Sequence, residues 1–110
     1  MSALYIMRYV GLGGFGAGAM FIGKGIISGI DAHGGVYDGT YTQTGGRFRG
    51  KAVVSFPEGG KMVTGKEMAK GESLPLEADW PTNFYNGLPQ TISILGHDVH
   101  ATFQKLRDIP

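Results

Sequence analysis

Apolar and polar positions alternate along much of this chain, in short runs that glycines separate. In the run RFRGKAVVSF (47–56), every second residue is apolar or glycine, and the residues between them are mostly charged or polar. The runs SLPLEADW (73–80) and VHATFQKL (99–106) show the same period of two. This period is typical of β-strands that bury one face. The pattern therefore predicts an all-β chain.

Glycine-containing turns set the ends of the predicted strands. Their connections are mostly two to six residues long, which is too short for the crossover that a parallel pair needs. Successive strands should therefore be antiparallel neighbours, and closing such a meander removes its exposed edges. We predict a single domain over residues 1–110, an antiparallel up-and-down meander that closes into a lipocalin-like barrel of about eight strands. The predicted strands cover residues 4–10, 17–22, 26–30, 36–42, 47–56, 61–65, 73–80, 91–95 and 99–106.

Alternation along these strands also predicts which side chains face the barrel interior. Many of them are small, so the interior is either closely packed or leaves a cavity for one small apolar ligand. Arg8 is predicted to share the inward face of the first strand with Ile6 and Val10, which makes it the best candidate for an internal anion contact. The other predicted interior residues are Ala17, Ala19, Phe21, Phe48, Ala52, Val54, Leu76, Ile92, Ile94 and Phe103.

The composition narrows the classes of function. The net charge is +1 and the lysines and arginines are scattered, so the basic patch typical of nucleic-acid-binding proteins is missing. The lack of cysteine excludes disulfides and thiolate metal sites and favours a cytoplasmic location. Residues 9–23 are uncharged, but this run is shorter than the roughly 20 residues of a membrane-spanning helix and is rich in glycine. We therefore expect neither a nucleic acid nor a membrane as a partner.

The stretch GLGGFGAG (11–18) matches the phosphate-binding pattern G-x-G-x-x-G at Gly11, Gly13 and Gly16. In dinucleotide-binding folds this loop opens a helix whose N-terminus holds the pyrophosphate. The next residues, AGAMFI, are predicted as a strand, so the required helix is missing. We interpret the stretch as the turn between the first two strands and expect no cofactor.

The sequence shows no constellation typical of catalysis or metal binding. His97 and His100 lie three apart across a turn and a strand start, so their side chains are expected on opposite faces. No serine lies in a G-x-S-x-G nucleophile elbow. An enzyme inside the barrel would need a buried acid, and the inward faces of the clearest strands carry none. The chain is therefore expected to be non-enzymatic, with no metal.

The loop PTNFYNGLPQ (81–90) gathers Phe84, Tyr85 and Leu88 among polar residues and prolines. Exposed aromatic residues concentrate at protein interfaces, so Phe84 and Tyr85 are candidates for contact with a partner. The alternative is that the loop plugs one end of the barrel. The sequence leaves both interpretations open.

The stretch GKGIISGIDAHGGVYDGTYTQTGG (23–46) resembles the GrlR family, small negative regulators of bacterial type III secretion and their relatives. The similarity rests on a glycine hairpin, a Gly-hydrophobic-Asp step at residues 29–31 and an aromatic-x-Gly segment at residues 37–41. The C-terminal VHATFQKLRDIP is also similar to relatives of that family. The resemblance implies a lipocalin-like antiparallel barrel that forms a homodimer and restrains a transcriptional activator.

In the founding member of that family, an acidic loop carries the contact with the activator. Alignment on residues 37–39 puts that loop near Gln43 and Thr44, where this chain reads QTGG and has no acidic residue. Gln43 and Thr44 are therefore candidate partner contacts, although the acidic chemistry does not carry over. We expect a non-enzymatic, GrlR-like regulatory or binding protein that acts through a protein partner. The alternative is a carrier or sensor of a small apolar ligand.

Overall fold

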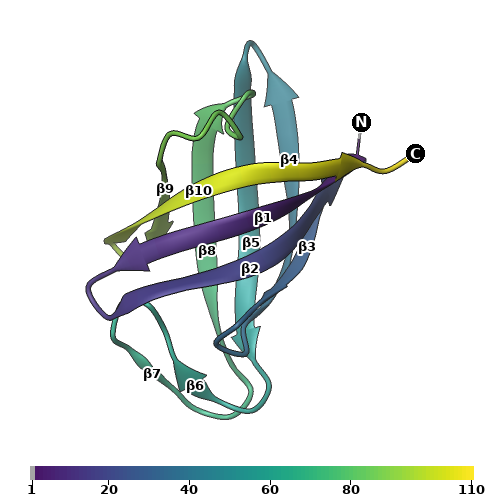
Figure 1. Ribbon diagram of the computed structural model, residues 1–110. Coiled ribbons are helices and arrows are strands. Elements are labelled where there is room, and N and C mark those ends of the chain that lie inside the picture. Colours follow the sequence, from purple (N-terminus) through teal and green to yellow (C-terminus); the bar gives the residue numbers. More distant parts are fainter. Residues whose placement is uncertain (1) are drawn as a thin grey trace.

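The computed structural model describes residues 2–110, which form strands wrapped around one interior (Figure 1). No helix occurs in this described range. The strands are β1 (Ser2–Gly11), β2 (Gly14–Gly23), β3 (Ile26–Asp31), β4 (Val36–Thr44), β5 (Arg47–Phe56), β6 (Gly60–Lys61), β7 (Glu67–Met68), β8 (Glu72–Pro81), β9 (Gln90–Ile94) and β10 (His97–Asp108).

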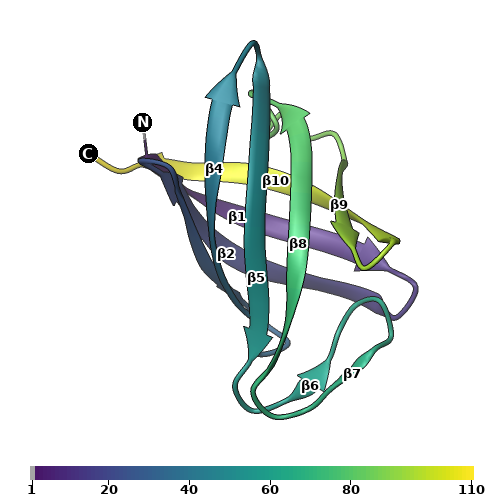
Figure 2. The ribbon, with the colours of Figure 1, turned by 180° about the vertical axis from the view of Figure 1, so that it is seen from behind.

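Eight of these strands form a closed antiparallel barrel in the order β1-β10-β9-β8-β5-β4-β3-β2. Consecutive barrel strands pair with each other, and β1 pairs with β10 to close the ring. The predicted all-β meander of about eight antiparallel strands is therefore confirmed. The start of β1 and the end of β10 lie together at one corner in both ribbon views (Figure 1, Figure 2), because Ala3 of β1 lies opposite Asp108 of β10.

The segment between β5 and β8 departs from the predicted strand order. The sequence predicts a barrel strand over residues 61–65, but only Gly60–Lys61 is extended, and it pairs with β7 outside the barrel. Gly65 then adopts a φ of 92°, which ends extended pairing. The segment folds over one end of the barrel (Figure 1). Its buried apolar side chains are Met62, Val63 and Met68.

A cluster of aromatic rings fills the opposite end of the barrel. The Phe48 ring stacks against Tyr41 and Trp80, with centroid distances of 4.8 and 5.4 Å. Phe84, from the loop before β9, inserts with its centroid 4.9 Å from that of Phe48 and 5.4 Å from that of Phe103. Phe84 is only 2% exposed, so the prediction that it contacts a partner is wrong. The phenyl ring of Phe84 carries no polar atom, so its burial leaves no hydrogen bond unsatisfied. Each aromatic pair in the cluster stabilises the fold by about 0.5–1.5 kcal/mol beyond the contribution of its buried area.

The first strand is turned the opposite way from the prediction. Tyr5, Met7 and Tyr9 are buried. Arg8 is exposed on the outer face, where its Nη1 donates a 3.2 Å hydrogen bond to Oε1 of Gln104. The predicted contact of Arg8 with an anion inside the barrel is therefore wrong. The physical reason is that β1 is apolar at nearly every position, so a period of two does not reveal which face points inward.

The second strand is reversed as well, because cross-strand partners share a face of the sheet. Gly16 and Gly18 point inward, opposite Tyr9 and Met7 of β1. A Cβ atom at Gly16 would lie 2.5 Å from the Tyr9 hydroxyl oxygen, so this glycine makes room for the phenol. The predicted interior residues on β2 lie on its outer face instead: Ala17, Ala19 and Phe21.

Alternation assigns the interior correctly in the strands that have one polar face. Phe48, Val54, Leu76, Ile92, Ile94 and Phe103 are buried, and Ala52 is partly buried. These side chains leave interior cavities of about 50 and 20 Å³. A water molecule takes up about 30 Å³ of liquid, whereas small-molecule sites span about 300–1,000 Å³. The interior is therefore filled, and the ligand-binding role of these residues stays a prediction.

Candidate functional site

A cluster of polar side chains lies inside the barrel end that the β6–β7 segment covers. Asp31, the last residue of β3, accepts hydrogen bonds at Oδ1 from the backbone N–H groups of His33 and Gly35, at 2.8 and 2.9 Å. Its Oδ2 accepts a 2.6 Å hydrogen bond from the hydroxyl of Tyr37 on β4. Tyr9 of β1 lines the same cavity as Asp31 and Tyr37. The barrel thus holds one partly buried acid with two phenols beside it.

Sequence reasoning misses this acid because Asp31 reads as the first residue of a turn. The prediction that no acid faces inward was limited to the clearest strands, and Asp31, at the end of β3, lies outside them. Burial raises the pKa of Tyr37, and the negative charge of Asp31 and its hydrogen bond raise that pKa further. The same causes raise the pKa of Tyr9. Both phenols stay protonated near neutral pH, so they serve as hydrogen-bond donors rather than as bases.

The space beside this cluster limits what chemistry it can perform. The adjoining cavity measures about 20 Å³, which leaves room for about one water and none for a substrate. Asp31 closes the β3–β4 turn by accepting two backbone N–H groups, as aspartates in Asx-turns do. We therefore assign the Asp31 cluster a structural role in closing this end of the barrel.

Metal binding has no support in the part of the chain that the structure describes. Within residues 2–110, no three His, Cys, Asp or Glu side chains are grouped to hold an ion. His97 and His100 are both exposed near the start of β10. The Nδ1 atom of His100 lies 3.5 Å from the hydroxyl oxygen of Thr91 on the neighbouring strand.

The glycine-rich stretch 11–18 forms the β1–β2 hairpin, with its two-residue turn at Leu12 and Gly13. The interpretation of this stretch as a turn is confirmed, although β2 starts earlier than predicted. The N–H of Gly13 donates to the backbone carbonyl of Val63, so this donor is not free for a phosphate. A Cβ atom at Gly13 would lie 2.5 Å from the backbone nitrogen of Gly65. Glycine therefore lets the hairpin pack closely against the β6–β7 segment.

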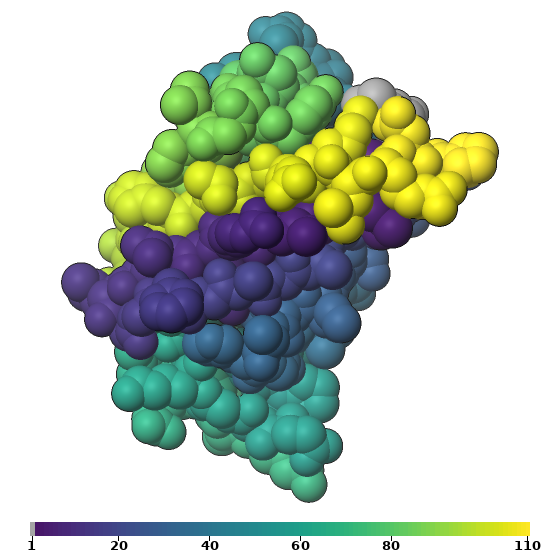
Figure 3. Space-filling model, viewed as in Figure 1, coloured from purple at the N-terminus to yellow at the C-terminus, as the bar shows by residue number. Residues whose placement is uncertain are grey.

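The outer face of β1–β4 carries an apolar row that crosses four strands. Cross-strand pairing places its members side by side: Ile6, Ala19, Ile30 and Val36. Ile30 is 60% exposed and Val36 is 39% exposed. Figure 3 views β10, β1 and β2 from outside, with β10 in yellow above the purple and blue of β1 and β2. Contiguous apolar surface of this kind is typical of a site that another molecule covers.

A trough of about 700 Å³ crosses the outer face of β10, β1 and β2 near the β1–β2 hairpin. Arg8 lines the trough together with His100 of β10 and His33 of the β3–β4 turn. Its apolar part includes Val10 and Phe15, which pair across the hairpin. Among the described residues, no Asp or Glu lines this trough. The trough thus combines the positive charge of Arg8 with apolar surface, and none of the described residues that line it is acidic.

The predicted partner contacts lie at two separate places. Gln43 and Thr44 are exposed at the end of β4, beside the hairpin that leads to β5. Tyr85 is half-buried against Phe84, with a centroid distance of 5.4 Å, and the ammonium group of Lys105 lies 5.1 Å from the centroid of the Tyr85 ring. These three predicted contacts reach the surface, and their role stays a prediction.

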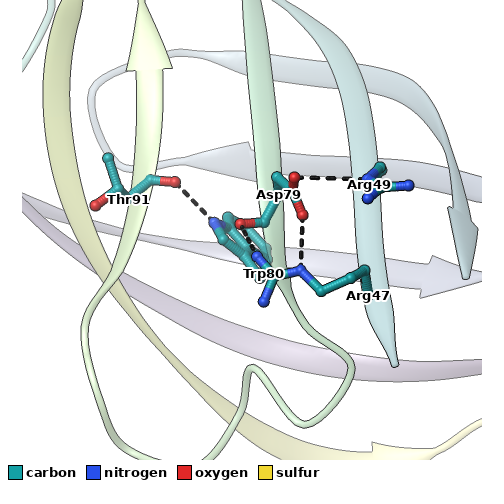
Figure 4. A network of polar contacts seen from close by, with 5 residues as sticks. All are labelled: Arg47, Arg49, Asp79, Trp80 and Thr91. Carbon is teal, nitrogen blue, oxygen red and sulfur yellow. Dashed lines mark hydrogen bonds and ion pairs between the residues drawn. The ribbon is translucent and has the colours of Figure 1, made fainter. Parts of the chain in front are cut away.

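The barrel wall is least regular between β8 and β9, which share the single ladder pair Glu77–Ser93. The indole N–H of Trp80 bridges this seam by donating a 2.7 Å hydrogen bond to the backbone carbonyl of Thr91 (Figure 4). The Trp80 side chain thus supplies a hydrogen bond between β8 and β9 where their backbone pairing ends. Because Trp80 also stacks on Phe48, the same residue joins the seam to the aromatic cluster.

The outer face beside this seam is polar and solvated. The Nε of Arg47 donates a 2.9 Å hydrogen bond to Asp79, and the Nε of Arg49 lies 3.5 Å from the other carboxylate oxygen (Figure 4). The hydrogen bond from Arg47 lowers the pKa of Asp79. These side chains are 42–60% exposed, so solvent screens the ion pairs and they add little to stability.

Comparisons with other proteins leave the family open. Within residues 2–110, the structure contains no helix of the length and apolarity needed to cross a membrane. No protein-family model matches this chain, and comparison with curated proteins and with solved structures found no similar protein. Membership of the GrlR family stays a prediction.

Proposed function

We propose that this protein is a non-catalytic binding protein of the cytoplasm, which works as a homodimer and acts through a protein partner. The observation that carries the proposal is the apolar row on the outer face of β1–β4, in which Ala19, Ile30 and Val36 are exposed and Ile6 is half-buried. Burying such side chains is favourable by about 25 cal/mol for each Å² removed from water. A second molecule that covers this row therefore stabilises the assembly.

A second copy of the chain suits this row. The eight barrel strands form a closed ring, so association through side chains on an outer face needs no free barrel-strand edge. The row places small Ala19 between the larger Ile6 and Ile30. Under a two-fold axis the same patch meets itself, and the large side chains of one copy can pack over the small residue of the other.

Two further observations indicate where on the barrel this protein binds its partner. The GrlR resemblance implies a transcriptional regulator, but the β4–β5 hairpin carries no acidic residue at Gln43 or Thr44, so we place the contact elsewhere on the barrel. We do not propose carriage of a small apolar ligand, because the interior cavities measure about 20 and 50 Å³. Between binding inside the barrel and binding on its outer surface, we therefore propose that the partner binds on the outer surface.

Sedimentation velocity over a range of concentrations tests the dimer. The unchanged protein should sediment as a dimer, and Ile30→Lys should shift it to a monomer because a charge then lies in the buried row. Ser93→Lys makes the same kind of change at an exposed position on β9 and should leave the dimer intact. A protein that is monomeric at every concentration, or an Ile30→Lys variant that remains dimeric, would contradict the proposal.

A further inference from the structure

We propose that the trough across β10, β1 and β2 binds an acidic, extended segment of the protein partner, an inference that rests on the proposed function. The trough is lined by Arg8, His33 and His100. A second hollow of about 470 Å³ adjoins it at Arg8 and continues to Lys105 and Tyr85. Among the described residues, neither hollow is lined by Asp or Glu. The surface is therefore complementary to a negatively charged chain.

Arg8 is the centre of this surface because it lines both hollows. Within residues 2–110 it forms no ion pair, and its side-chain hydrogen bond goes to the neutral amide of Gln104. The other cation of the surface, Lys105, already has a 2.8 Å contact with Asp108. Arg8 is thus the guanidinium available to a carboxylate, which it can bind through two parallel hydrogen bonds.

Apolar side chains flank Arg8 on the hairpin side. Val10 and Phe15 face each other across β1 and β2 and are 54% and 78% exposed. The hairpin that carries them is anchored through Gly13 to the carbonyl of Val63, so they are held in place before a partner arrives. Alternate side chains of an extended segment lie about 7 Å apart on one face. One acidic side chain can therefore reach Arg8 while its neighbour on that face packs on Val10 and Phe15.

A protein segment fits this surface better than a lipid bilayer does. The surface is concave, and Arg8 lines the hollows themselves. A bilayer presents a broad, nearly flat face, whereas a single extended chain fits a trough of about 700 Å³. We therefore assign the trough to a protein segment and include vesicles in the test.

Selection from a displayed library of random decapeptides tests this assignment directly, because such a selection requires no named partner. Peptides selected on the unchanged protein should be enriched in Asp and Glu next to aliphatic or aromatic residues. Fluorescence anisotropy of the consensus peptide should then show binding about tenfold weaker to Arg8→Gln, because a charge-assisted hydrogen bond is lost. Phe15→Ser should also weaken it. Lys51→Gln, which removes an exposed cation from the outer face of β5, should leave the affinity unchanged.

Several results would overturn the assignment. They are the absence of any enriched peptide, a consensus without acidic residues, and equal binding to Arg8→Gln. Flotation with vesicles of phosphatidylglycerol and phosphatidylcholine would also overturn it if the vesicles bind in an Arg8-dependent way and the peptide does not. The Ile30→Lys variant separates the two proposals. If it still binds the peptide, the trough works without the dimer, and a failed dimer test leaves this inference standing.

Discussion

The hydroxyl of Tyr37 on β4 donates a 2.6 Å hydrogen bond to the carboxylate of Asp31 at the end of β3. The same carboxylate accepts the backbone N–H groups of His33 and Gly35. The turn between the two strands and the end of the barrel interior are thereby joined through one side chain. This makes Asp31 more important to the fold than its place in a short polar turn indicates.

The Asp31→Asn substitution tests this role. The amide keeps one oxygen for the backbone N–H groups, but its NH₂ cannot accept the Tyr37 proton, so we expect the free energy of unfolding to fall by about 1–3 kcal/mol. Urea denaturation measures the change. Asp38→Asn, on the exposed face of β4, is the matched control and should have little effect. Equal effects of the two substitutions would show that the Asp31 bonds contribute nothing.

Alkaline pH should destabilise the protein. In the unfolded chain phenols lose their protons near pH 10, whereas burial and Asp31 hold the pKa of Tyr37 above that value in the folded chain. The stabilisation is therefore complete below pH 10 and is lost as the pH rises above 10. The slope should approach about 1.4 kcal/mol per pH unit for this phenol. Unfolding measured between pH 8 and 11 should show a shallower decline in Tyr37→Phe, and an unchanged slope would contradict the assignment.

Gly13→Ala should destabilise the contact between the β1–β2 hairpin and the β6–β7 segment. The new Cβ atom would lie 2.5 Å from the backbone nitrogen of Gly65 and 2.7 Å from the carbonyl oxygen of Val63, so backbone has to move. We expect a loss of roughly 1–3 kcal/mol and faster amide exchange in residues 60–68. Leu12→Ala removes an adjacent side chain that is 92% exposed and should change stability much less.

Nucleotides should leave the melting temperature unchanged. A ligand that binds only the folded state raises that temperature, so thermal unfolding with millimolar ATP or NAD is a direct test. The expectation rests on the hairpin geometry, because the glycine stretch leads into β2 and Gly13 uses its N–H on Val63. A concentration-dependent rise would reopen the phosphate-binding interpretation.

Trp80→Phe should loosen the seam between β8 and β9. The phenyl ring can still stack on Phe48, but it cannot donate to the Thr91 carbonyl, so we expect a loss of about 1 kcal/mol plus faster amide exchange in β9. Thr91→Ala keeps the backbone carbonyl and removes only the hydroxyl group. It should therefore leave exchange in β9 nearly unchanged. Equal exchange in Trp80→Phe and the unchanged protein would mean that the ladder alone closes the seam.

The candidate surfaces were predictable only in part. The sequence identifies Arg8 as an isolated cation among apolar residues, and Tyr85 as an aromatic residue in a polar loop. It does not show that Arg8 faces outward or that one trough and its adjoining hollow bring it together with His100 and Tyr85. These residues are far apart in the sequence, and only the closure of β1 on β10 brings them near each other.

Local patterns in the sequence were sufficient for the fold class and for the strands with one polar face. In β5 and β10, polar residues at every second position leave one register that buries the apolar face, so Phe48 and Phe103 could be assigned inward. The glycine turns between strands also marked an antiparallel meander, because short connections permit little else.

The tertiary structure alone decided the faces of β1 and β2 and the content of the interior. Both strands are apolar on each side, so alternation allows two registers, and the choice depends on which side chains fit against the rest of the barrel. Tyr9 fits inward because Gly16 opposite it has no side chain. The same fit turns Arg8, Ala17 and Ala19 outward. It also decides between the two interiors that the sequence left open, because the core is closely packed and leaves only small cavities.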